Sequence, residues 1–232
     1  MKTSLSLLGC CCFLWLIFID GCSKDDLAPN EHIPRPHLPP PVVKNTYTEE
    51  FAQHTNVMEI KGWVFKNHSS DPNIEGWHKD YTPDAKSPNV SVLSPAYSDN
   101  NDPHAFAYVQ GAWTQTIDIW MLTPPVELKN GDKISFYTKT AQQSPDSINL
   151  LEIRLNPSDT SSDIGNQPKE IGKFSVLLGK VFEDYPKIWT KKEFIVSGLN
   201  GTIRSRIALR YYIPHVSTPG AIGIDVLKFE KM

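Results

Sequence analysis

The chain has 232 residues, of which 23 are lysine or arginine and 26 are aspartate or glutamate, and its formal net charge at pH 7 is −3. A nearly neutral chain lacks the basic face that nucleic-acid binding needs, so we expect no nucleic-acid partner. The length allows one large β domain or two small ones, with ample material for a hydrophobic core.

Residues 1–21 are predicted to form a leader, a signal peptide rather than a folded element. Lys2 precedes an apolar run from Leu5 to Ile19, which is too short for the roughly 20 residues of a membrane-spanning helix. The run ends in Ile19-Asp20-Gly21-Cys22, which resembles the lipobox of bacterial lipoproteins. This resemblance predicts cleavage before Cys22 and acylation of that residue, with an ordinary secretion signal or an uncleaved anchor helix as the alternatives.

The cysteines support a lipid anchor. All four of them, Cys10, Cys11, Cys12 and Cys22, lie in the leader or at its end. A disulfide framework, a cysteine-ligated zinc site and a cysteine nucleophile are therefore excluded from the rest of the chain. Acyl chains on Cys22 would bury enough methylene groups, at about 0.8 kcal/mol each, to hold the protein in outer-membrane lipid.

Residues 22–45 are predicted to be the lipidated cysteine and an extended tether. Ser23-Lys24-Asp25-Asp26 resembles the acidic export signal that sends Bacteroidetes lipoproteins to the outer face of the outer membrane. The alternative is a polar start to an ordinary linker. Six prolines follow between Leu27 and Lys44 and favour polyproline geometry. We therefore expect a lipid-anchored protein whose domain faces the cell exterior.

Residues 46–232 are predicted to form one all-β domain, a jelly-roll β-sandwich of about ten strands without a convincing helix. At its centre, strands at 117–122 and 133–139 are predicted to form a hairpin through Asn130-Gly131-Asp132, because Asn and Gly accept a positive φ. In residues 203–213, apolar side chains alternate with Arg206 and Arg210, which is typical of a half-buried strand. The remaining strands are predicted at 49–51, 57–65, 90–93, 104–110, 148–155, 170–178, 189–196 and 221–229.

Several of these segments resemble one family. Trp120-Met121-Leu122-Thr123-Pro124-Pro125, followed by Gly131-Asp132-Lys133-Ile134-Ser135-Phe136, resembles the core of the choice-of-anchor J family. Similar segments follow at 151–155, 189–190, 206–212 and 222–226. The family comprises MAM-like jelly-roll domains of Bacteroidetes surface proteins, which are related to the cleaved-adhesin domains. Because its members share no single activity, the resemblance implies a fold and a habitat rather than a function.

Motifs for catalysis are missing from the sequence. It contains no GxSxG elbow, no HExxH helix, no phosphate-binding glycine loop and no dinucleotide fingerprint. We therefore predict that the chain is not an enzyme. A hydrolase with paired carboxylates or a Ser–His–Asp set assembled in space is the less favoured interpretation.

Structural calcium is the inorganic cofactor that we expect. Carboxylate and carbonyl oxygens are the ligands that Ca²⁺ prefers, and an ion of this kind can stabilise a β-sandwich without disulfides. The resemblance to jelly-roll modules implies a site between the first strand, a loop and the last strand. The corresponding residues are Glu50, Asp99, Asp102 and Asp225, although Val226 replaces the second of two aspartates that the family frequently has.

Four aromatic residues lie in or beside predicted loops and are candidate ligand contacts: Trp77, Tyr81, Tyr97 and Trp113. An exposed ring beside amides and carboxylates can stack on the apolar face of a sugar. The alternative is that these rings pack under the loops and fasten them. The sequence thus predicts a surface-displayed binding module for a glycan or for a host or cell-surface protein. The alternative function is a structural accessory subunit of an outer-membrane polysaccharide-uptake complex.

Overall fold

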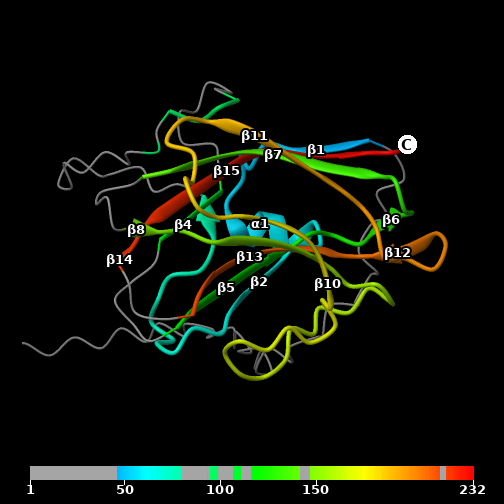
Figure 1. The fold of residues 1–232 in the computed structure, drawn as a ribbon, viewed down its shortest axis with the longest axis horizontal. Helices are drawn as coiled ribbons and strands as arrows, with labels where there is room; N and C mark the ends of the chain where they lie inside the picture. Colours follow the sequence, from blue (N-terminus) through cyan, green and yellow to red (C-terminus); the bar gives the residue numbers. More distant parts are fainter. Residues whose placement is uncertain are drawn as a thin grey trace, which may run out of the picture. The chain divides into compact units, whose positions relative to one another are not determined.

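The computed structural model describes residues 46–79, 93, 95–98, 107–110, 116–141, 147–214 and 218–232. The predicted signal peptide, Cys22, the export signal and most of the tether lie outside these residues. Within the described part, the chain forms two large antiparallel sheets and only one short helix. Figure 1 shows the six-stranded sheet in the upper half of the view and the five-stranded sheet in the lower half. The predicted all-β sandwich is confirmed.

The six-stranded sheet has the order β11-β7-β15-β4-β3, and β1 also pairs with β15. Its strands are β1 (Tyr47–Glu49), β3 (His78–Lys79), β4 (Ala107–Gln110), β7 (Lys133–Thr140), β11 (Thr190–Ile195) and β15 (Ala221–Glu230). The five-stranded sheet has the order β10-β9-β13-β5-β2. Its strands are β2 (Val64–Asn67), β5 (Ile117–Leu122), β9 (Leu151–Leu155), β10 (Val176–Val181) and β13 (Ile207–Ile213).

Two small sheets complete the described strands. β6 (Val126–Leu128) pairs antiparallel with β12 (Ile203–Ser205), and β8 (Ser147–Ile148) pairs parallel with β14 (Thr218–Pro219). Sequence reasoning predicted one strand at 148–155 and one at 203–213, whereas the structure divides each of them in two. Arg206 marks the second division, since its guanidinium donates to the carbonyls of Gly62 and Thr123.

The hydrophobic core fills the space between the two large sheets. In both sheets, alternate residues point inward, as the two-residue period of a strand requires. The inward residues are buried and include Ile117, Ile119, Met121, Ile134, Phe136, Leu151, Ile153, Leu155, Leu209, Tyr211, Ile222, Ile224 and Leu227. Burial of this row accounts for the correct prediction of β5, β7, β13 and β15.

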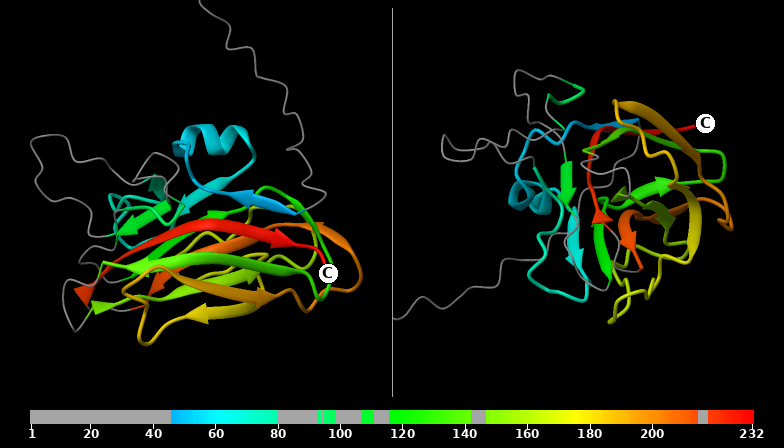
Figure 2. Two further views of the ribbon diagram at one scale, coloured as in Figure 1. Left: turned by 90° about the horizontal axis from the view of Figure 1, so that it is seen from above. Right: turned by 60° about the vertical axis from the view of Figure 1, so that its left-hand side comes forward.

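The predicted strand at 57–65 is wrong. Residues in its first half form the helix α1 (Thr55–Ile60), and β2 starts only at Val64. The amide of Met58 donates to the carbonyl of His54, and Met58 alone among the residues of α1 is buried. Figure 2 shows α1 outside the stacked strands. A helix of six residues has too few turns to produce a recognisable apolar period.

The predicted central hairpin is also wrong, although both of its strands exist. β5 belongs to the five-stranded sheet and β7 to the six-stranded sheet, so the connection crosses from one layer to the other. The turn lies where it was predicted, with Gly131 at a φ of +96°. The backbone amide of Lys129 donates to the carboxylate of Asp132 across this turn.

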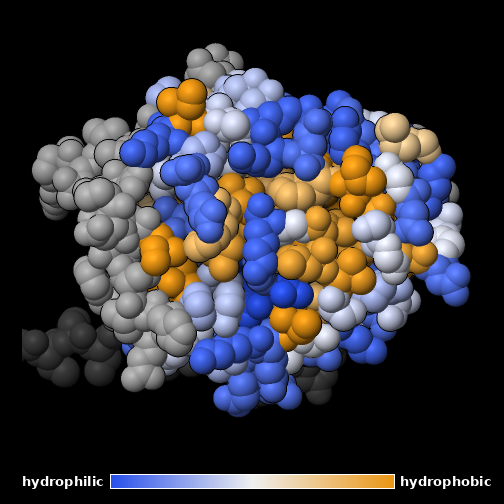
Figure 3. All heavy atoms as spheres, in the orientation of Figure 1, coloured by the Kyte–Doolittle hydropathy of each residue, from blue (hydrophilic) through white to orange (hydrophobic). Residues whose placement is uncertain are grey.

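β10 and β11 are the edge strands of the two large sheets. Figure 3 shows apolar side chains gathered on the face between these strands. The chain from β10 to the end of β11 also carries four exposed large apolar residues, Leu177, Phe182, Ile188 and Ile195. Among the described residues, no helix has the length and apolar character needed to cross a bilayer.

Candidate functional site

The outer face of the five-stranded sheet is occupied by the protein itself. Residues 156–175, called the covering loop below, pack Ile164 and Phe174 onto Trp120 and Ala208 of that face. The amide of Lys169 donates to the carboxylate of Asp118 at 2.9 Å and so holds the loop down. This sheet therefore offers no exposed outer surface where the loop lies.

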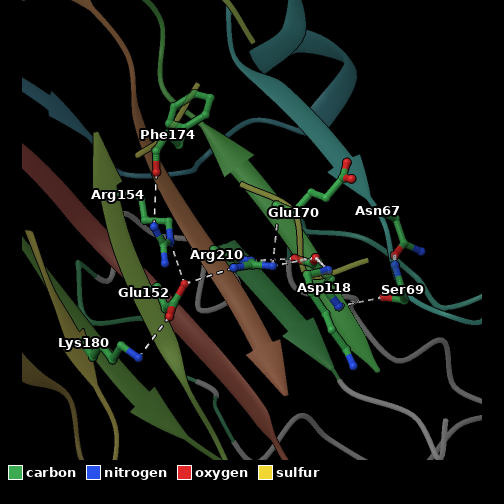
Figure 4. A network of polar contacts seen from close by, with 10 residues as sticks. Asn67, Ser69, Asp118, Glu152, Arg154, Glu170, Phe174, Lys180 and Arg210 are labelled. Carbon is green, nitrogen blue, oxygen red and sulfur yellow. Dashed lines mark hydrogen bonds and ion pairs between the residues drawn. The ribbon is translucent and has the colours of Figure 1, made fainter. Parts of the chain in front are cut away.

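A network of buried charges lies beneath the covering loop (Figure 4). The Arg210 guanidinium lies between Asp118 and Glu152, with its Nε 2.7 Å from Asp118 Oδ1 and its Nη1 3.3 Å from Glu152 Oε2. Arg154 Nε also donates to Glu152 Oε2, at 2.7 Å. Burial acts to raise the pKa of Glu152, but the bonds from Arg154 and Lys180 outweigh it and lower that pKa. Both carboxylates are bound by cations, so neither is placed to act as a general base.

The outer face of the six-stranded sheet is different because aromatic side chains remain accessible there. Alternation along β7 turns Ile134 and Phe136 inward and Tyr137 and Lys139 outward. Tyr137 is aligned with Lys191 of β11 on one side and with Asp225 of β15 on the other. Residues aligned in this way point to the same face of a sheet.

A short segment, residue 93 and residues 95–98, crosses this face, and we call it the strap. Its apolar residues Leu93 and Ala96 pack with Ala141, Ala221 and the ring of Trp189. The indole Nε1 of Trp189 donates to the carbonyl of Pro95 at 2.9 Å. Ala221 belongs to β15, Ala141 directly follows β7 and Trp189 directly precedes β11, so the strap is fixed on the sheet at three strands.

The strap ends on an aromatic pair. The rings of Tyr97 and Tyr137 are stacked, with centroids 3.5 Å apart and an angle of 15° between their planes. A hydrogen bond to Tyr137 raises the pKa of Tyr97. Tyr97 is nevertheless 43% exposed. The ring of Tyr97 is thus accessible, and stacking on the ring of Tyr137 holds it in position.

Asp225 anchors the end of the strap. Its Oδ2 accepts hydrogen bonds from the Ser98 amide at 2.8 Å and from the Ser98 hydroxyl at 3.0 Å, while the Val226 amide donates to Oδ1 at 2.7 Å. The carboxylate is fully buried, and burial raises its pKa to about 6 against these hydrogen bonds. Val226 has a φ of +49° at the β-bulge that follows Asp225. This bulge is the site of backbone strain next to the candidate binding surface.

The structure brings together two residues that the sequence singled out for different roles. Tyr97 was a candidate ligand contact and Asp225 a candidate metal ligand, and both belong to the same surface through Ser98. Trp77 does not belong to it, because its side chain is only 3% exposed and lies in the core. A buried ring cannot stack on a ligand, so the interpretation of Trp77 as a sugar platform is wrong.

Most of the remaining predicted site residues lie outside the part of the chain that the structure describes. Tyr81, Asp99, Asp102 and Trp113 lie outside the described residues, as do Cys22 and the export signal Ser23, Lys24, Asp25 and Asp26. Glu50 is exposed, whereas its neighbour Glu49 is buried and accepts the Phe51 amide at 3.0 Å.

The described part of the predicted calcium site consists of Glu50 and Asp225. In the part of the chain that the structure describes, no three histidine, cysteine, aspartate or glutamate side chains gather as a metal site would require. Asp225 is surrounded by hydrogen-bond donors, whereas Ca²⁺ needs several oxygen ligands at about 2.3–2.6 Å. Glu50 and Asp225 therefore do not fit a calcium site by themselves. A site that also uses Asp99 or Asp102 stays a prediction.

Sequence reasoning missed Tyr137, Lys191 and Ser98. The alternation of β7 was sufficient to place Tyr137 on the outer face between Ser135 and Lys139. No comparable signal identified Ser98, because its contact with Asp225 joins residues 127 positions apart.

Comparison with solved structures supports the fold. The K1 cleaved adhesin domain of Lys-gingipain from Porphyromonas gingivalis matches with a TM-score of 0.55 at 15% identity, over 81% of this chain and 99% of that chain. The K3 domain of the same protein matches with a TM-score of 0.51 at 12% identity, over 79% of this chain and 96% of that chain. At these identities, the likeness shows a shared β-sandwich fold and nothing of its ligand.

Weaker likenesses do not extend this result. A CBM22 xylan-binding domain of Xyn10C from Paenibacillus barcinonensis has a TM-score of 0.40 at 14% identity, over 81% of this chain and 96% of that chain. No protein-family model matches the chain, and no curated protein is similar to it in sequence. The resemblance to the choice-of-anchor J family therefore stays a prediction.

Proposed function

We propose that this chain is a non-catalytic glycan-binding module that a lipid on Cys22 holds at the outer face of the outer membrane. The observation that carries the glycan assignment is the exposed ring of Tyr97, which is stacked on Tyr137 and fixed by the strap. Aromatic rings bind sugars through the apolar C–H face of the pyranose, and nearby polar groups orient the hydroxyls.

The geometry of the pair suits this role. Because Tyr97 is already stacked and its neighbour Ser98 is bonded to Asp225, little side-chain freedom remains to be lost on binding. The phenolic groups and the Lys191 ammonium supply donors beside the ring. A preformed ring with donors at its edge is the arrangement that a sugar-binding surface needs.

The fold and the sequence support the remaining parts of the proposal. The two most similar folds described above belong to domains that are named adhesins, and an adhesin binds rather than cleaves. The lipid anchor and the outward orientation are supported by the sequence around Cys22, with Ser23, Lys24, Asp25 and Asp26 as the export signal.

A specific observation favours a second candidate function, membership in a larger outer-membrane complex. The chain from β10 to the end of β11 carries four exposed large apolar side chains, Leu177, Phe182, Ile188 and Ile195. Exposed apolar surface is typical of protein–protein contact sites where it forms a contiguous patch. In this case the same chain would act as an accessory subunit, and chemical crosslinking in intact cells would recover a fixed partner through this segment.

The glycan assignment is tested with the purified full chain on a glycan array, followed by titration of the glycans that bind. Tyr97→Ala should weaken binding about tenfold, because it removes the stacked ring, whereas Tyr97→Phe should retain most of the affinity. Phe182→Ala is the matched control, since Phe182 is 46% exposed but directly follows β10, the edge strand of the other large sheet. Absence of any glycan ligand, or equal losses for Tyr97→Ala and Phe182→Ala, would contradict the proposal.

The lipid anchor is tested separately by metabolic labelling with palmitate. Label should enter the wild-type chain and not Cys22→Ala. Protease added to intact cells should degrade the domain if it faces the exterior, whereas protection from the protease would show that it faces the periplasm.

A further inference from the structure

The charges on the outer face of the six-stranded sheet are unevenly arranged. At the end of this face where β7 begins, lysines and glutamates form ion pairs. Lys133 Nζ lies 3.2 Å from Glu193 and 3.0 Å from Glu230. Lys228 lies 2.9 Å from Glu230, and Lys191 lies 2.7 Å from Glu193. Every lysine of this end therefore has a carboxylate partner.

Lys139, at the opposite end of β7, is arranged differently. Among the described residues, no carboxylate lies within ion-pair distance of its ammonium group, whose contacts are the Leu93 carbonyl at 3.4 Å and the Trp189 ring centroid at 6.0 Å. Partial burial under the strap lowers the pKa of Lys139. Lys139 is thus a partly desolvated cation that no carboxylate in the described part of the chain pairs with.

This cation lies beside the aromatic pair. Lys139 and Tyr137 are two positions apart on β7 and point to the same outer face. The strap contacts both residues. Its Leu93 carbonyl accepts a hydrogen bond from Lys139, and its Tyr97 ring stacks on the ring of Tyr137. A ligand that stacks on Tyr97 therefore has a cation within reach along the strap.

We propose that Lys139 recognises the anionic group of an acidic sugar whose ring stacks on Tyr97, so that the site takes uronic-acid or sulfated glycans in preference to neutral ones. This inference rests on the proposed glycan-binding function and specifies the ligand class of the same site. An ammonium group has three donors, and the single long bond to Leu93 leaves donors for a carboxylate or a sulfate.

Among the described residues, Asp225 is the acidic residue that contacts the strap, and it does not oppose this assignment. Asp225 is fully buried and its oxygens receive hydrogen bonds from Ser98 and Val226, so its carboxylate is not exposed to a ligand. Glu193 is likewise held, by Lys133 and Lys191. Among the described residues, the ion-paired end has no unpaired cation for an anionic ligand, whereas the end with Lys139 has one.

The test compares matched acidic and neutral glycans by titration calorimetry with the full chain. Trigalacturonate is compared with its methyl ester, and a sulfated galactan oligosaccharide with its desulfated form. In at least one of the two glycan pairs, the acidic glycan should bind about tenfold more tightly than the neutral one, as expected for one charge-assisted hydrogen bond. Its affinity should fall as sodium chloride is raised, since salt screens an exposed ionic contact. The two pairs distinguish a carboxylate from a sulfate.

Variants at the lysine complete the test. Lys139→Met keeps the apolar stem and should reduce the affinity for the acidic glycan to that of the neutral one, whereas Lys139→Arg should restore the preference. Lys173→Met is the control, because Lys173 is an exposed lysine on the covering loop of the other sheet. Thermal unfolding of each variant verifies that the protein is folded.

The outcomes separate the inference from the function on which it rests. If neutral and acidic members bind equally and Lys139→Met changes nothing, the inference is overturned while the glycan-binding function stands. If no glycan binds at all, the proposed function fails and the inference fails with it.

Discussion

Arg210 and Asp118 form a two-fold ion pair inside the protein. Arg210 Nε and Nη2 each lie 2.7 Å from one of the two carboxylate oxygens of Asp118, and the two side chains are 2% and 0% exposed. The guanidinium carbon also lies 3.9 Å from the ring centroid of Tyr212 and 4.6 Å from that of Trp120. Because Arg210 Nη2 reaches the carbonyl of Glu170, the pair fixes the covering loop as well as the sheet.

Replacement of Arg210 should be strongly destabilising. Arg210→Met leaves Asp118 and Glu152 buried and without their common cation, and the loss of one partner of a buried pair typically costs about 3–5 kcal/mol. We expect a reduction of that size in the free energy of unfolding, measured by urea denaturation. Lys173→Met removes an exposed pair with Asp159 and should cost no more than about 1 kcal/mol.

A double-mutant cycle tests the explanation. Asp118→Asn and Arg210→Met should each destabilise the protein, and the double variant should lose less than the sum because both remove the same interaction. A loss below about 1 kcal/mol for Arg210→Met would show that the network contributes little to stability, and additive losses would show that Asp118 and Arg210 are not coupled.

Asp225 should make the stability depend on pH in the direction opposite to that of a salt-bridged acid. Burial raises its pKa from 3.8 to about 6, so the folded chain binds more protons than the unfolded chain between these values. The contribution of Asp225 to stability therefore falls as the pH rises from about 4 to about 6, and it stays low above that. A shift of about two units corresponds to about 3 kcal/mol.

The measurement compares urea midpoints of the wild type and Asp225→Asn from pH 4 to pH 8. The difference between the two proteins isolates Asp225 from acids whose pKa is lowered, such as Glu152, which act in the opposite direction. We expect the wild type to lose stability relative to Asp225→Asn as the pH rises. Parallel curves would show that the Asp225 carboxyl titrates as an ordinary exposed acid.

Trp77 should affect stability rather than ligand binding. Its side chain lies in the core, and truncation of a buried tryptophan to alanine typically costs about 3–5 kcal/mol. We expect Trp77→Ala to lower the melting temperature while the folded fraction keeps its glycan affinity. Reduced affinity in a fully folded Trp77→Ala sample would restore the interpretation of Trp77 as a contact residue.

Gly179 should tolerate no larger residue. A Cβ atom at this position of β10 would lie 2.5 Å from the ring of Phe194 on β11, so the ring would have to move out of the space between the edge strands. We expect Gly179→Val to cost about 1–3 kcal/mol in the free energy of unfolding. Gly76→Ala is the control, since nothing lies within 4 Å of the added atom, and should be nearly neutral.

Much of the fold was predictable because local pattern and tertiary burial agree. β5 was predicted with the bounds that it has, and β7, β11, β13 and β15 to within a few residues, since each alternates apolar residues on a strand that faces the core. α1 was not predictable, because six residues with one buried side chain carry neither a helical period nor a capping signal. The division of β5 and β7 between two sheets depends on pairing partners far away in the sequence.

The candidate site was predictable only in part. Tyr97 was identified from its type and its position beside a loop, whereas the same reasoning failed for Trp77 because burial depends on the whole fold. Arg210 was assigned to the solvent face of a half-buried strand. The predicted alternation of side chains along β13 is correct, but the covering loop buries the outer face of this strand. No local sequence pattern shows where a loop of twenty residues will pack.

β15 joins the start of the described chain to the candidate site. It pairs with β1 near its C-terminal end and holds the strap through Asp225 in its middle. If the chain is anchored and binds sugar as proposed, a mechanical load that enters through the residues before Tyr47 passes from β1 to β15, the strand that then also carries a pull on a sugar at Tyr97. The two forces would meet within this one strand, so β15 is the strand that flow past the cell would stretch.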